Sequence, residues 1–357
     1  MRRGFISRSL IETPDAAYAA RLDRLRLLMH ETQLDALMIY TNNSRTAGAS
    51  WLTGFIPYWS DGLLVVPRSG EPTLTVALSF RSKPWIERTS RVTEVILKPR
   101  IGFEAAQLIA KGHANAAVGI VDYDNLPAGV ADELREGGPR LTFSDASDLF
   151  STLRMVADPT ETALAAKAAS IASDALGEIP PNTTSSSKIL AAVEYKARWL
   201  GAEEVYLAVA PDLAVDRRLI RIDGERSLGR TFAVRATVAY KGTWVRIVRT
   251  IDHDATTSQI NTASARFAQA VAQLPEHNGL SAFKTWLVEG SRLAQPLDPL
   301  IGSRVTSPFK VPAGALVSVQ AEVTVDDRVM LLGAPALTGR SGESAGLLHA
   351  PAWLNSL

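Results

Sequence analysis

The chain has 357 residues, which is long enough for two domains and a sizeable hydrophobic core. Its formal net charge is +1, with 46% apolar and 21% charged residues, so no overall field attracts nucleic acid or an anionic membrane. The absence of cysteine excludes disulfides, thiolate nucleophiles and cysteine-ligated zinc.

Nothing in the sequence indicates a membrane or secretory segment. No apolar run approaches the roughly 18 residues that a transmembrane helix needs. The residues at 1–25 lack the apolar core of a secretory signal. We therefore expect a soluble, cytoplasmic protein that binds neither a membrane nor nucleic acid.

The first part of the chain alternates helical and strand patterns. Leu22, Leu25 and Leu28 recur at helical spacing, which predicts a helix over 15–34. The following elements are a strand at 35–40, a Gly/Asn/Ser-rich loop at 41–55, strands at 61–67, 72–78 and 91–97, a helix at 103–113 and a strand at 115–124. This alternation is typical of an α/β domain, which we place at residues 1–150.

The second part opens with a long helix. Asp158 is its expected N-cap, Pro159 its first residue, and Glu161 lies three residues after the cap. In the polar break that follows, we expect Ser187 to cap a second helix. The later elements are a hairpin around 240–242, helices at 262–274 and 281–290, and strands at 315–325 and 328–333. We place this α+β domain at residues 151–357.

Two arginines interrupt the apolar strands of the hairpin. Tyr240-Lys241-Gly242 reads as a tight turn in which the glycine adopts an unusual backbone angle. Arg235 precedes this turn, and Arg246 follows it in TWVRIVRT, eleven residues later. Strand alternation predicts that both guanidinium groups point to the same side of the sheet.

Several segments together resemble the creatinase/aminopeptidase P/prolidase family, and they occur in the order found there. RLDRLRLLMHETQLDALMIY, followed by NNSRTAGASWLTGF, is similar to the start of its N-terminal domain. LRMVADPTETALAAKAASIASDAL resembles the linker and first helix of its "pita-bread" domain, and KGTWVRIVRT resembles its signature hairpin. VPAGALVSVQAEV resembles a strand that normally carries a metal-binding glutamate. The resemblance implies a creatinase-like α/β domain, a pita-bread domain and a homodimer.

Metal-dependent members of that family hold two metal ions with two aspartates, one histidine and two glutamates. The resemblance places the aspartates at Arg235 and Arg246, and the glutamates at Gln320 and near Gly333. Residues 280–310, where the histidine motif belongs, contain no histidine. Arginine donates hydrogen bonds and cannot supply the anionic oxygens that such metals need. We therefore expect no metal, no other cofactor and no Xaa-Pro peptidase activity.

The arginine pair has two interpretations that the sequence leaves open. Guanidinium groups bind carboxylates and phosphates, so Arg235 and Arg246 could hold a small anionic ligand or an amino-acid derivative. Alternatively, they form ion pairs within the protein, with Glu322 as the first candidate partner. Gln320 and Glu322 are two residues apart on one strand and therefore point to the same side, so we expect both to face the former metal cleft.

The functional hypotheses follow from that choice. The first is a peptidase-inactive homologue, a pseudoenzyme, that binds a small anionic ligand or a partner protein. The second is a metal-free hydrolase or lyase acting on a small carboxylate, since creatinase itself is a metal-free member. The arginine that creatinase uses to grip its substrate is missing from residues 54–66, and no catalytic histidine is found in the right segment. A third hypothesis is a subunit that pairs with an active homologue.

An aromatic cluster lies near residue 55. We expect Trp51 and Phe55 to pack beneath the loop, and Tyr58 and Trp59 to line the partner's pocket in a homodimer. Asp252-His253-Asp254 suggests a catalytic or metal site, but neighbouring strand residues point to opposite faces, so we expect a solvated strand end there. The arginine-rich segment 216–230 lacks interleaved aromatic residues and reads as a solvated loop.

Overall fold

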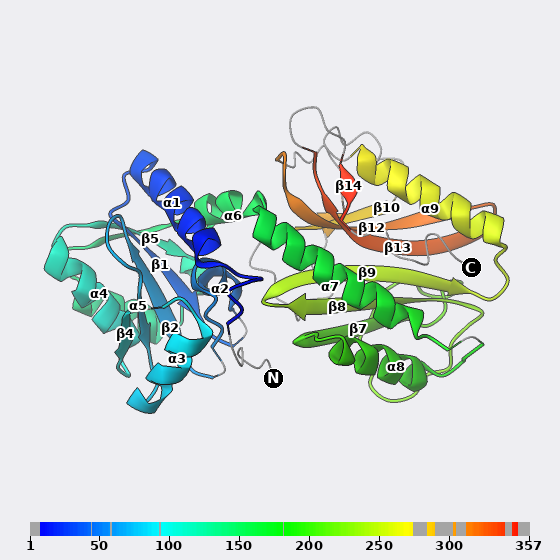
Figure 1. Cartoon of the computed structure of the whole chain (residues 1–357), viewed down its shortest axis with the longest axis horizontal. Helices are drawn as coiled ribbons and strands as arrows, with labels where there is room; N and C mark the ends of the chain where they lie inside the picture. Colours follow the sequence, from blue (N-terminus) through cyan, green and yellow to red (C-terminus); the bar gives the residue numbers. More distant parts are fainter. Residues whose placement is uncertain are drawn as a thin grey trace. The chain divides into compact units, whose positions relative to one another are not determined.

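The structure is a computed structural model. It describes residues 8–43, 45–57, 59–92, 94–180, 182–273, 312–339 and 345–348, together with the backbone of 284–289 and 303–304. The chain divides into two compact units, Met1–Arg154 and Met155–Leu357. Each unit has its own β-sheet and its own hydrophobic core (Figure 1).

The N-terminal unit is built around a mixed six-stranded sheet of order β4-β3-β2-β1-β5-β6. Strand β1 pairs with β2 in antiparallel and with β5 in parallel orientation. The strands are β1 (Ala36–Thr41), β2 (Gly62–Pro67), β3 (Thr73–Val76), β4 (Glu94–Leu97), β5 (Ala117–Val121) and β6 (Thr142–Asp145). The helices are α1 (Asp15–Glu31), α2 (Ala47–Thr53), α3 (Lys83–Thr89), α4 (Ile101–Gly112), α5 (Ala128–Gly137) and α6 (Ser147–Met155), with short 3₁₀ turns at Phe80–Ser82 and Tyr123–Asn125.

Alternating strand residues build the core of this unit. Met38 of β1 and Leu63 of β2 pack against Ile101 and Ala105 of α4. The predicted loop at 41–55 is wrong in part, because it contains helix α2. The Ser, Asn and Gly content of that segment suggested a loop, yet Trp51 is buried and stacks edge-on against Phe150. Burial of a large side chain outweighs weak local propensity here.

The second unit is built around an eight-stranded sheet of order β11-β10-β12-β13-β9-β8-β7, with β14 paired to β13. Every neighbouring pair of strands in it is antiparallel. The strands are β7 (Glu204–Ala210), β8 (Thr231–Tyr240), β9 (Thr243–Asp252), β10 (Lys284–Glu289), β11 (Ser303–Arg304), β12 (Leu316–Val325), β13 (Arg328–Leu337) and β14 (Gly346–Leu347). Helices α7 (Pro159–Gly177), α8 (Ser186–Trp199) and α9 (Thr257–Ala272) cover one face of this sheet (Figure 1).

The helix starts follow from local chemistry. Asp158 accepts a hydrogen bond from the Glu161 amide, and the Glu161 side chain accepts one from the Asp158 amide, which confirms the predicted capping box of α7. The predicted cap of α8 is wrong by two residues. Ser185 rather than Ser187 is the N-cap, because its hydroxyl accepts from the Lys188 amide.

The predicted helix at 281–290 is also wrong, since its described part, 284–289, is strand β10. This strand pairs along its whole length with β12. Its sequence KTWLVE is rich in aromatic and β-branched residues, which fit a pleated sheet better than a short helix. The register of this sheet places the candidate residues of the site.

Candidate functional site

The hairpin between β8 and β9 fixes the register of the site. Lys241 and Gly242 form its two-residue turn with φ of 48° and 79°, the left-handed angles of a type I′ turn. The Glu203 carboxylate accepts hydrogen bonds from both turn amides, at 2.9 and 3.0 Å. Arg235 therefore lies opposite Val248, and Arg246 opposite Thr237.

This register brings the two arginines to one face of the sheet. Because side chains alternate along a strand, Arg235, Thr237, Arg246 and Val248 all point to the same side. Arg235 and Arg246 are diagonal cross-strand neighbours, a relation that separates Cα atoms by about 7–8 Å and lets long side chains meet. We call this surface the arginine face.

Gln320 and Glu322 lie on the arginine face as well. Val248 pairs with Gly333 across β9 and β13, and Gly333 pairs with Gln320 across β13 and β12. Glu322 follows two residues later on the same strand. Arg235, Val248, Gly333 and Gln320 thus form one row across four strands. Four of the positions at which the resemblance expects metal ligands, Arg235, Arg246, Gln320 and Gly333, share this face.

The arginine face is polar although largely covered. Arg235 is only 6% exposed, and Thr237 on the same strand and Ser318 on β12 are also buried. Arg246 and Gln320 are half-buried. The Glu322 side chain is 16% exposed and forms an ion pair with Arg217 at 3.4 Å. The two residues lie 105 positions apart in the chain, so no local pattern predicts this contact.

The donor set does not suit a metal ion. Guanidinium and amide groups replace the expected carboxylates at three positions. At the fourth, a Cβ atom added to Gly333 would lie 2.8 Å from the Val248 Cγ2, so no side chain fits there without movement. Within the described ranges, no group of three or more His, Cys, Asp or Glu residues is arranged to hold a metal ion.

The loop after β7 folds over one part of the arginine face. Leu213 and Leu219 from this loop pack with Ala233, Val248 and Leu331 in a buried apolar cluster. Arg217 and Arg218, between these anchors, remain exposed, and Arg218 pairs with Asp216. The predicted solvated loop is therefore correct for these charged residues but missed the two leucine anchors.

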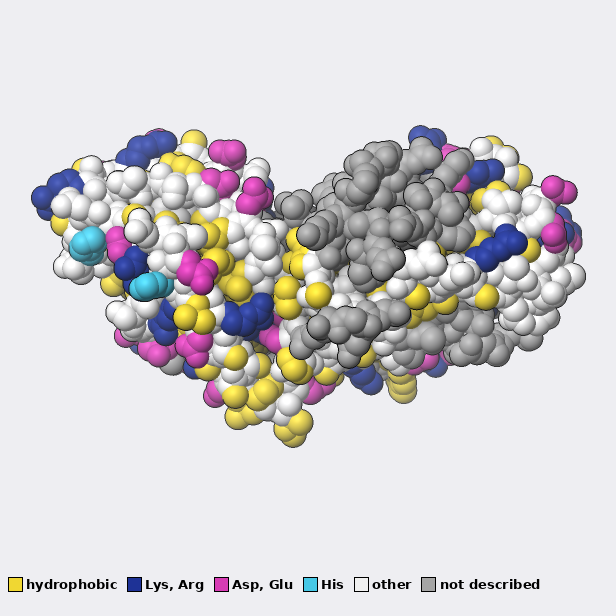
Figure 2. All heavy atoms as spheres, turned by 90° about the horizontal axis from the view of Figure 1, so that it is seen from above, with side chains coloured by type: hydrophobic (Ala, Val, Ile, Leu, Met, Phe, Trp, Pro, Cys, Tyr) yellow, Lys and Arg dark blue, Asp and Glu magenta, His cyan; other side chains and the backbone are white. Residues whose placement is uncertain are grey.

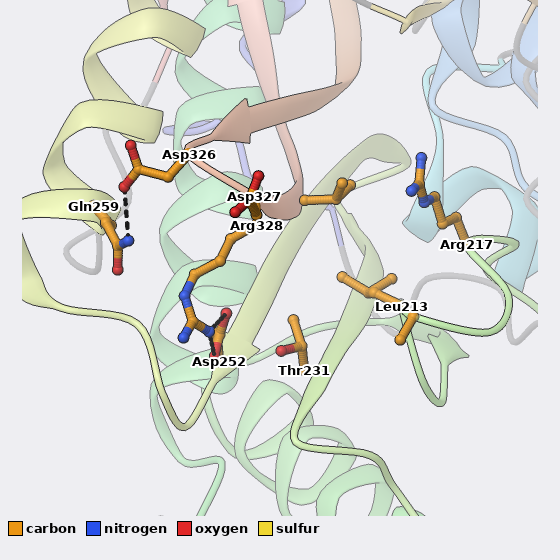
Figure 3. A pocket seen from close by; sticks show the side chains of 10 residues that line it. Leu213, Arg217, Thr231, Asp252, Gln259, Asp326, Asp327 and Arg328 are labelled. Atoms are coloured by element: carbon orange, nitrogen blue, oxygen red, sulfur yellow. Dashed lines mark hydrogen bonds and ion pairs between the residues drawn. The ribbon is translucent and has the colours of Figure 1, made fainter.

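A polar pocket of about 480 Å³ adjoins this loop (Figure 3). Arg217, Thr231 and Asp252 contribute to its wall, and Arg328 extends from the β12–β13 turn toward Asp252 (Figure 3). Both Asp252 oxygens accept from the Arg328 guanidinium at 2.9 Å, and the Asp252 side chain is only 2% exposed. Arg217 belongs both to this pocket and to the Glu322 ion pair, so the pocket lies beside the arginine face.

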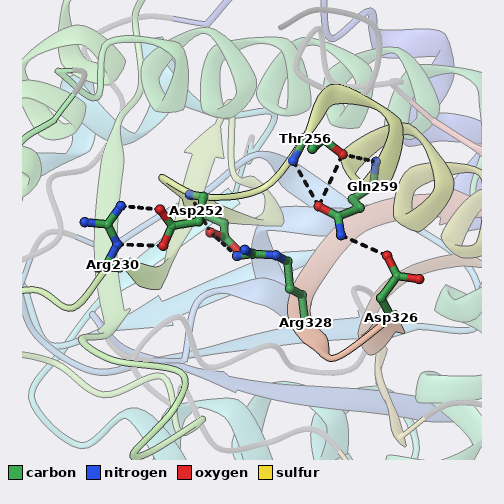
Figure 4. A network of polar contacts seen from close by, with 7 residues as sticks. Arg230, Asp252, Thr256, Gln259, Asp326 and Arg328 are labelled. Carbon is green, nitrogen blue, oxygen red and sulfur yellow. Dashed lines mark hydrogen bonds and ion pairs between the residues drawn. The ribbon is translucent and has the colours of Figure 1, made fainter.

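The segment Asp252-His253-Asp254 does not converge on one point, as predicted. Asp252 binds Arg328, whereas Asp254 binds Arg230 in a separate pair (Figure 4). The hydrogen bond from Arg230 lowers the pKa of Asp254. The expectation of a solvated strand end is wrong for Asp252, whose side chain is 2% exposed. It is also wrong for His253, whose Nε2 atom is buried without a hydrogen-bond partner among the described residues.

The aromatic candidates belong to the N-terminal unit. Trp51 and Phe55 are buried, which confirms their predicted packing role. Trp59 is 54% exposed and stacks on Trp85, with ring centroids 6.5 Å apart. Tyr58 lies outside the described residues. Its role and that of Trp59 in a partner's pocket stay predictions.

One face of the molecule, shown in Figure 2, has no dominant charge over its described part. Basic and acidic side chains are interspersed over the described part of the face shown in Figure 2. Of the helices formed by described residues, none is long and apolar enough to cross a bilayer.

Comparison with known proteins identifies the N-terminal domain directly. Residues 21–156 match the family model of the Creatinase/Prolidase N-terminal domain. A search of curated proteins finds no match to the chain.

The fold matches solved structures over almost the whole chain. The X-Pro aminopeptidase from Thermotoga maritima MSB8 has a TM-score of 0.67 at 13% identity, covering 92% of this chain and 97% of that one. The prolidase from Pyrococcus horikoshii OT3 has a TM-score of 0.68 at 15% identity over 92% and 97%. The dipeptidase PepE from Mycobacterium ulcerans has a TM-score of 0.65 at 19% identity over 94% and 96%.

These findings confirm the predicted fold class, an α/β creatinase-like domain followed by a pita-bread domain. Residues 21–156 thus carry the Creatinase/Prolidase N-terminal domain, and the fold of the chain is similar to that of solved X-Pro aminopeptidases and prolidases.

Proposed function

We propose that this protein is a peptidase-inactive member of its family that binds a small anionic ligand on the arginine face without a metal ion. The observation that carries the proposal is the shared register of Arg235, Arg246 and Gln320 on one sheet face. In the family resemblance these positions carry the metal carboxylates. Cation and amide donors there reverse the preference of the surface from metal ions to anions.

The burial of the arginine face supports this proposal. A guanidinium group at 6% exposure, such as that of Arg235, is held in a region where electrostatic attraction is stronger than in bulk water. The hydroxyl of Thr237, two residues along the same strand, is also buried and adds a hydrogen-bonding group for a carboxylate or phosphate. Arg246 is half-buried and extends the cationic surface by one row.

An anion screen tests the proposal. Phosphate and small carboxylates should raise the melting temperature of the wild-type protein, and Arg246→Ala should remove most of that shift. Arg135→Ala is the matched control, because Arg135 is an exposed arginine that pairs with Asp132 on the surface of the N-terminal domain. Equal shifts in all three proteins would argue against binding at the arginine face.

Metal content gives a second, independent test. Protein incubated with manganese, cobalt or zinc and then dialysed should retain no stoichiometric metal by elemental analysis. Xaa-Pro dipeptides should remain uncleaved with each metal. Two tightly bound ions per chain would show that the assignment of ligand positions is wrong.

A second candidate function rests on Glu322. Its carboxylate lies on the arginine face and is 16% exposed, so a bound substrate could meet both a guanidinium and a general acid or base. The protein would then be a metal-free hydrolase or lyase acting on a small carboxylate, the second hypothesis drawn from the sequence. If turnover of such a compound is found, Glu322→Gln should lower kcat by about a hundredfold or more and leave binding largely intact. Unchanged turnover would exclude Glu322 from catalysis.

We also propose that the protein is a cytoplasmic homodimer. Trp59 and Trp85 stack together, with Trp59 half exposed, as an apolar surface available to a second chain. Sedimentation at micromolar concentration should give about twice the chain mass of 38.4 kDa. A monomer, or a complex formed only with an active homologue, would contradict the homodimer.

A further inference from the structure

A second pocket lies on the opposite, helix-covered face of the same sheet. It has a volume of about 310 Å³ and lies among the end of α7, the first turns of α9, and strands β9 and β13. Its apolar wall includes Ile179, Ile260 and Leu332, which pack against the main hydrophobic core. The volume falls at the lower end of the range of small-molecule sites.

Arg249 brings a buried cation into this pocket. Its guanidinium donates one hydrogen bond, 3.2 Å long, to the Leu176 carbonyl oxygen at the end of α7. Burial lowers the pKa of Arg249. Within the described ranges, Arg249 forms no ion pair. A half-buried guanidinium with one acceptor has donors to spare and favours an anion beside it.

Two further polar groups line the same pocket. Ser264 of α9 is 6% exposed, and its Oγ has no hydrogen-bond partner among the described residues. A helical serine ordinarily bonds the carbonyl one turn earlier, but this hydroxyl does not. His253 also lines the pocket, with its Nε2 buried and without a partner in the described part of the chain. Buried polar atoms without partners are rare and costly, so each needs an explanation.

We propose that this pocket binds a small carboxylic acid with an apolar body. The carboxylate would accept from Arg249 and from the Ser264 hydroxyl, and the hydrocarbon part would lie against Ile179, Ile260 and Leu332. The site is distinct from the arginine face, because Arg249 and Arg246 alternate to opposite sides of strand β9. Asp252 does not compete with the ligand carboxylate for Arg249, because the Asp252 carboxylate already forms an ion pair with Arg328.

Titration calorimetry and ligand-observed NMR with hexanoate and phenylacetate test this site. Wild-type protein should bind at least one of them, and hexanol, the uncharged counterpart, should bind much more weakly. Arg249→Gln should weaken binding by about tenfold to a hundredfold, the effect of losing a charged hydrogen bond. Ser264→Ala should weaken it by about two- to tenfold.

Two more variants keep the test decisive if Arg249→Gln folds poorly. Ser264→Leu should fill the pocket and abolish binding while the circular dichroism spectrum stays native. Ser173→Ala is the matched control, because the buried Ser173 hydroxyl also has no partner among the described residues but does not line this pocket. It should bind the probes like the wild type. No binding of either acid, equal binding of hexanol, or unchanged binding in Ser264→Leu would each overturn the proposal.

Discussion

The two faces of the second sheet use the same strands in different ways. On the helix-covered face, Val234, Ala236 and Ile247 belong to an apolar core with α7 and α9, which gives way to the Arg249 pocket toward the end of β9. On the arginine face, the alternate residues of the same strands include Arg235 and Arg246. A strand whose two faces differ so sharply carries a core on one side and a polar surface built for another purpose on the other.

Exchanging the character of the two faces should produce the largest effect. Val234→Arg would place an unpaired charge in the core under α7, where Val234 is fully buried. We expect a loss of more than about 4 kcal/mol, enough to prevent folding in many domains. Arg235→Met, one residue away, should cost clearly less and leave a folded chain. Urea denaturation compares them, and equal losses would mean that the two faces do not differ as described.

Substitution of Gly333, in the row with Arg235, Val248 and Gln320, should cause the next largest loss of stability. In Gly333→Ala the new Cβ would lie 2.8 Å from Val248 Cγ2 and 3.0 Å from its Cβ. Overpacking of this kind costs about 1–3 kcal/mol. Adding Val248→Ala should recover part of the loss, because the two positions share one space.

Gly129→Ala, in helix α5, is the control for Gly333→Ala. Nothing lies within 4 Å of a Cβ at that position, so it should be neutral or stabilising by up to about 1 kcal/mol. Urea denaturation measures both. If Gly333→Ala is as harmless as the control, a side chain fits at position 333, and sterics do not exclude a carboxylate ligand at this position.

Removing the Asp252–Arg328 ion pair, which joins the end of β9 to the start of β13, should cause a moderate loss of stability. Asp252→Asn leaves the Arg328 guanidinium without its carboxylate, and the Asp252 side chain is 2% exposed. Since Arg328 is 32% exposed and can be solvated, we expect a loss of about 1–2 kcal/mol rather than the larger cost of a fully buried pair. Asp216→Asn, in the exposed pair with Arg218, should leave the thermal midpoint unchanged. Equal effects would contradict the role of burial.

The exposed Arg230–Asp254 pair should give the smallest effect. The Arg230 hydrogen bond lowers the pKa of Asp254 in the folded protein. Any stabilisation from the pair is therefore present above the ordinary Asp pKa and is lost as the pH falls through the lower pKa of the folded state. Arg230→Gln should raise the pKa of Asp254 toward its usual range, as followed by NMR titration, with no measurable change in stability near neutral pH. A depressed pKa in the variant would mean that another group holds this carboxylate.

Local chemistry allowed much of the fold to be predicted from the sequence. The Asp158 capping box and the Lys241-Gly242 turn depend on residues a few positions apart, and both are confirmed. The helix predicted at 281–290 is wrong because the partner of β10, strand β12, lies more than twenty residues away, and this pairing adds to the strand propensity of KTWLVE. Helix α2 was missed because burial of Trp51 stabilises a segment of weak propensity.

The site was predictable only in part. The alternation of side chains along a strand predicts that Arg235 and Arg246 share one face, because this prediction requires only the two strands of one hairpin and the turn between them. The Arg217–Glu322 contact joins residues 105 positions apart and needs the three-dimensional path of the loop. The Arg249 pocket was missed because nothing in the sequence connects His253 with Ser264 on α9. The structure shows that both have a buried polar atom without a partner among the described residues.

A crystal structure of the protein grown with phosphate, or with the carboxylate that stabilises it most, tests the central claim most directly. We predict an anion on the arginine face, within hydrogen-bond distance of both Arg235 and Arg246, and no metal ion beside it. The contrary result would be two guanidinium groups fully paired by protein carboxylates with no cavity next to them. The arginine face would then be a structural ion-pair network and not a ligand site.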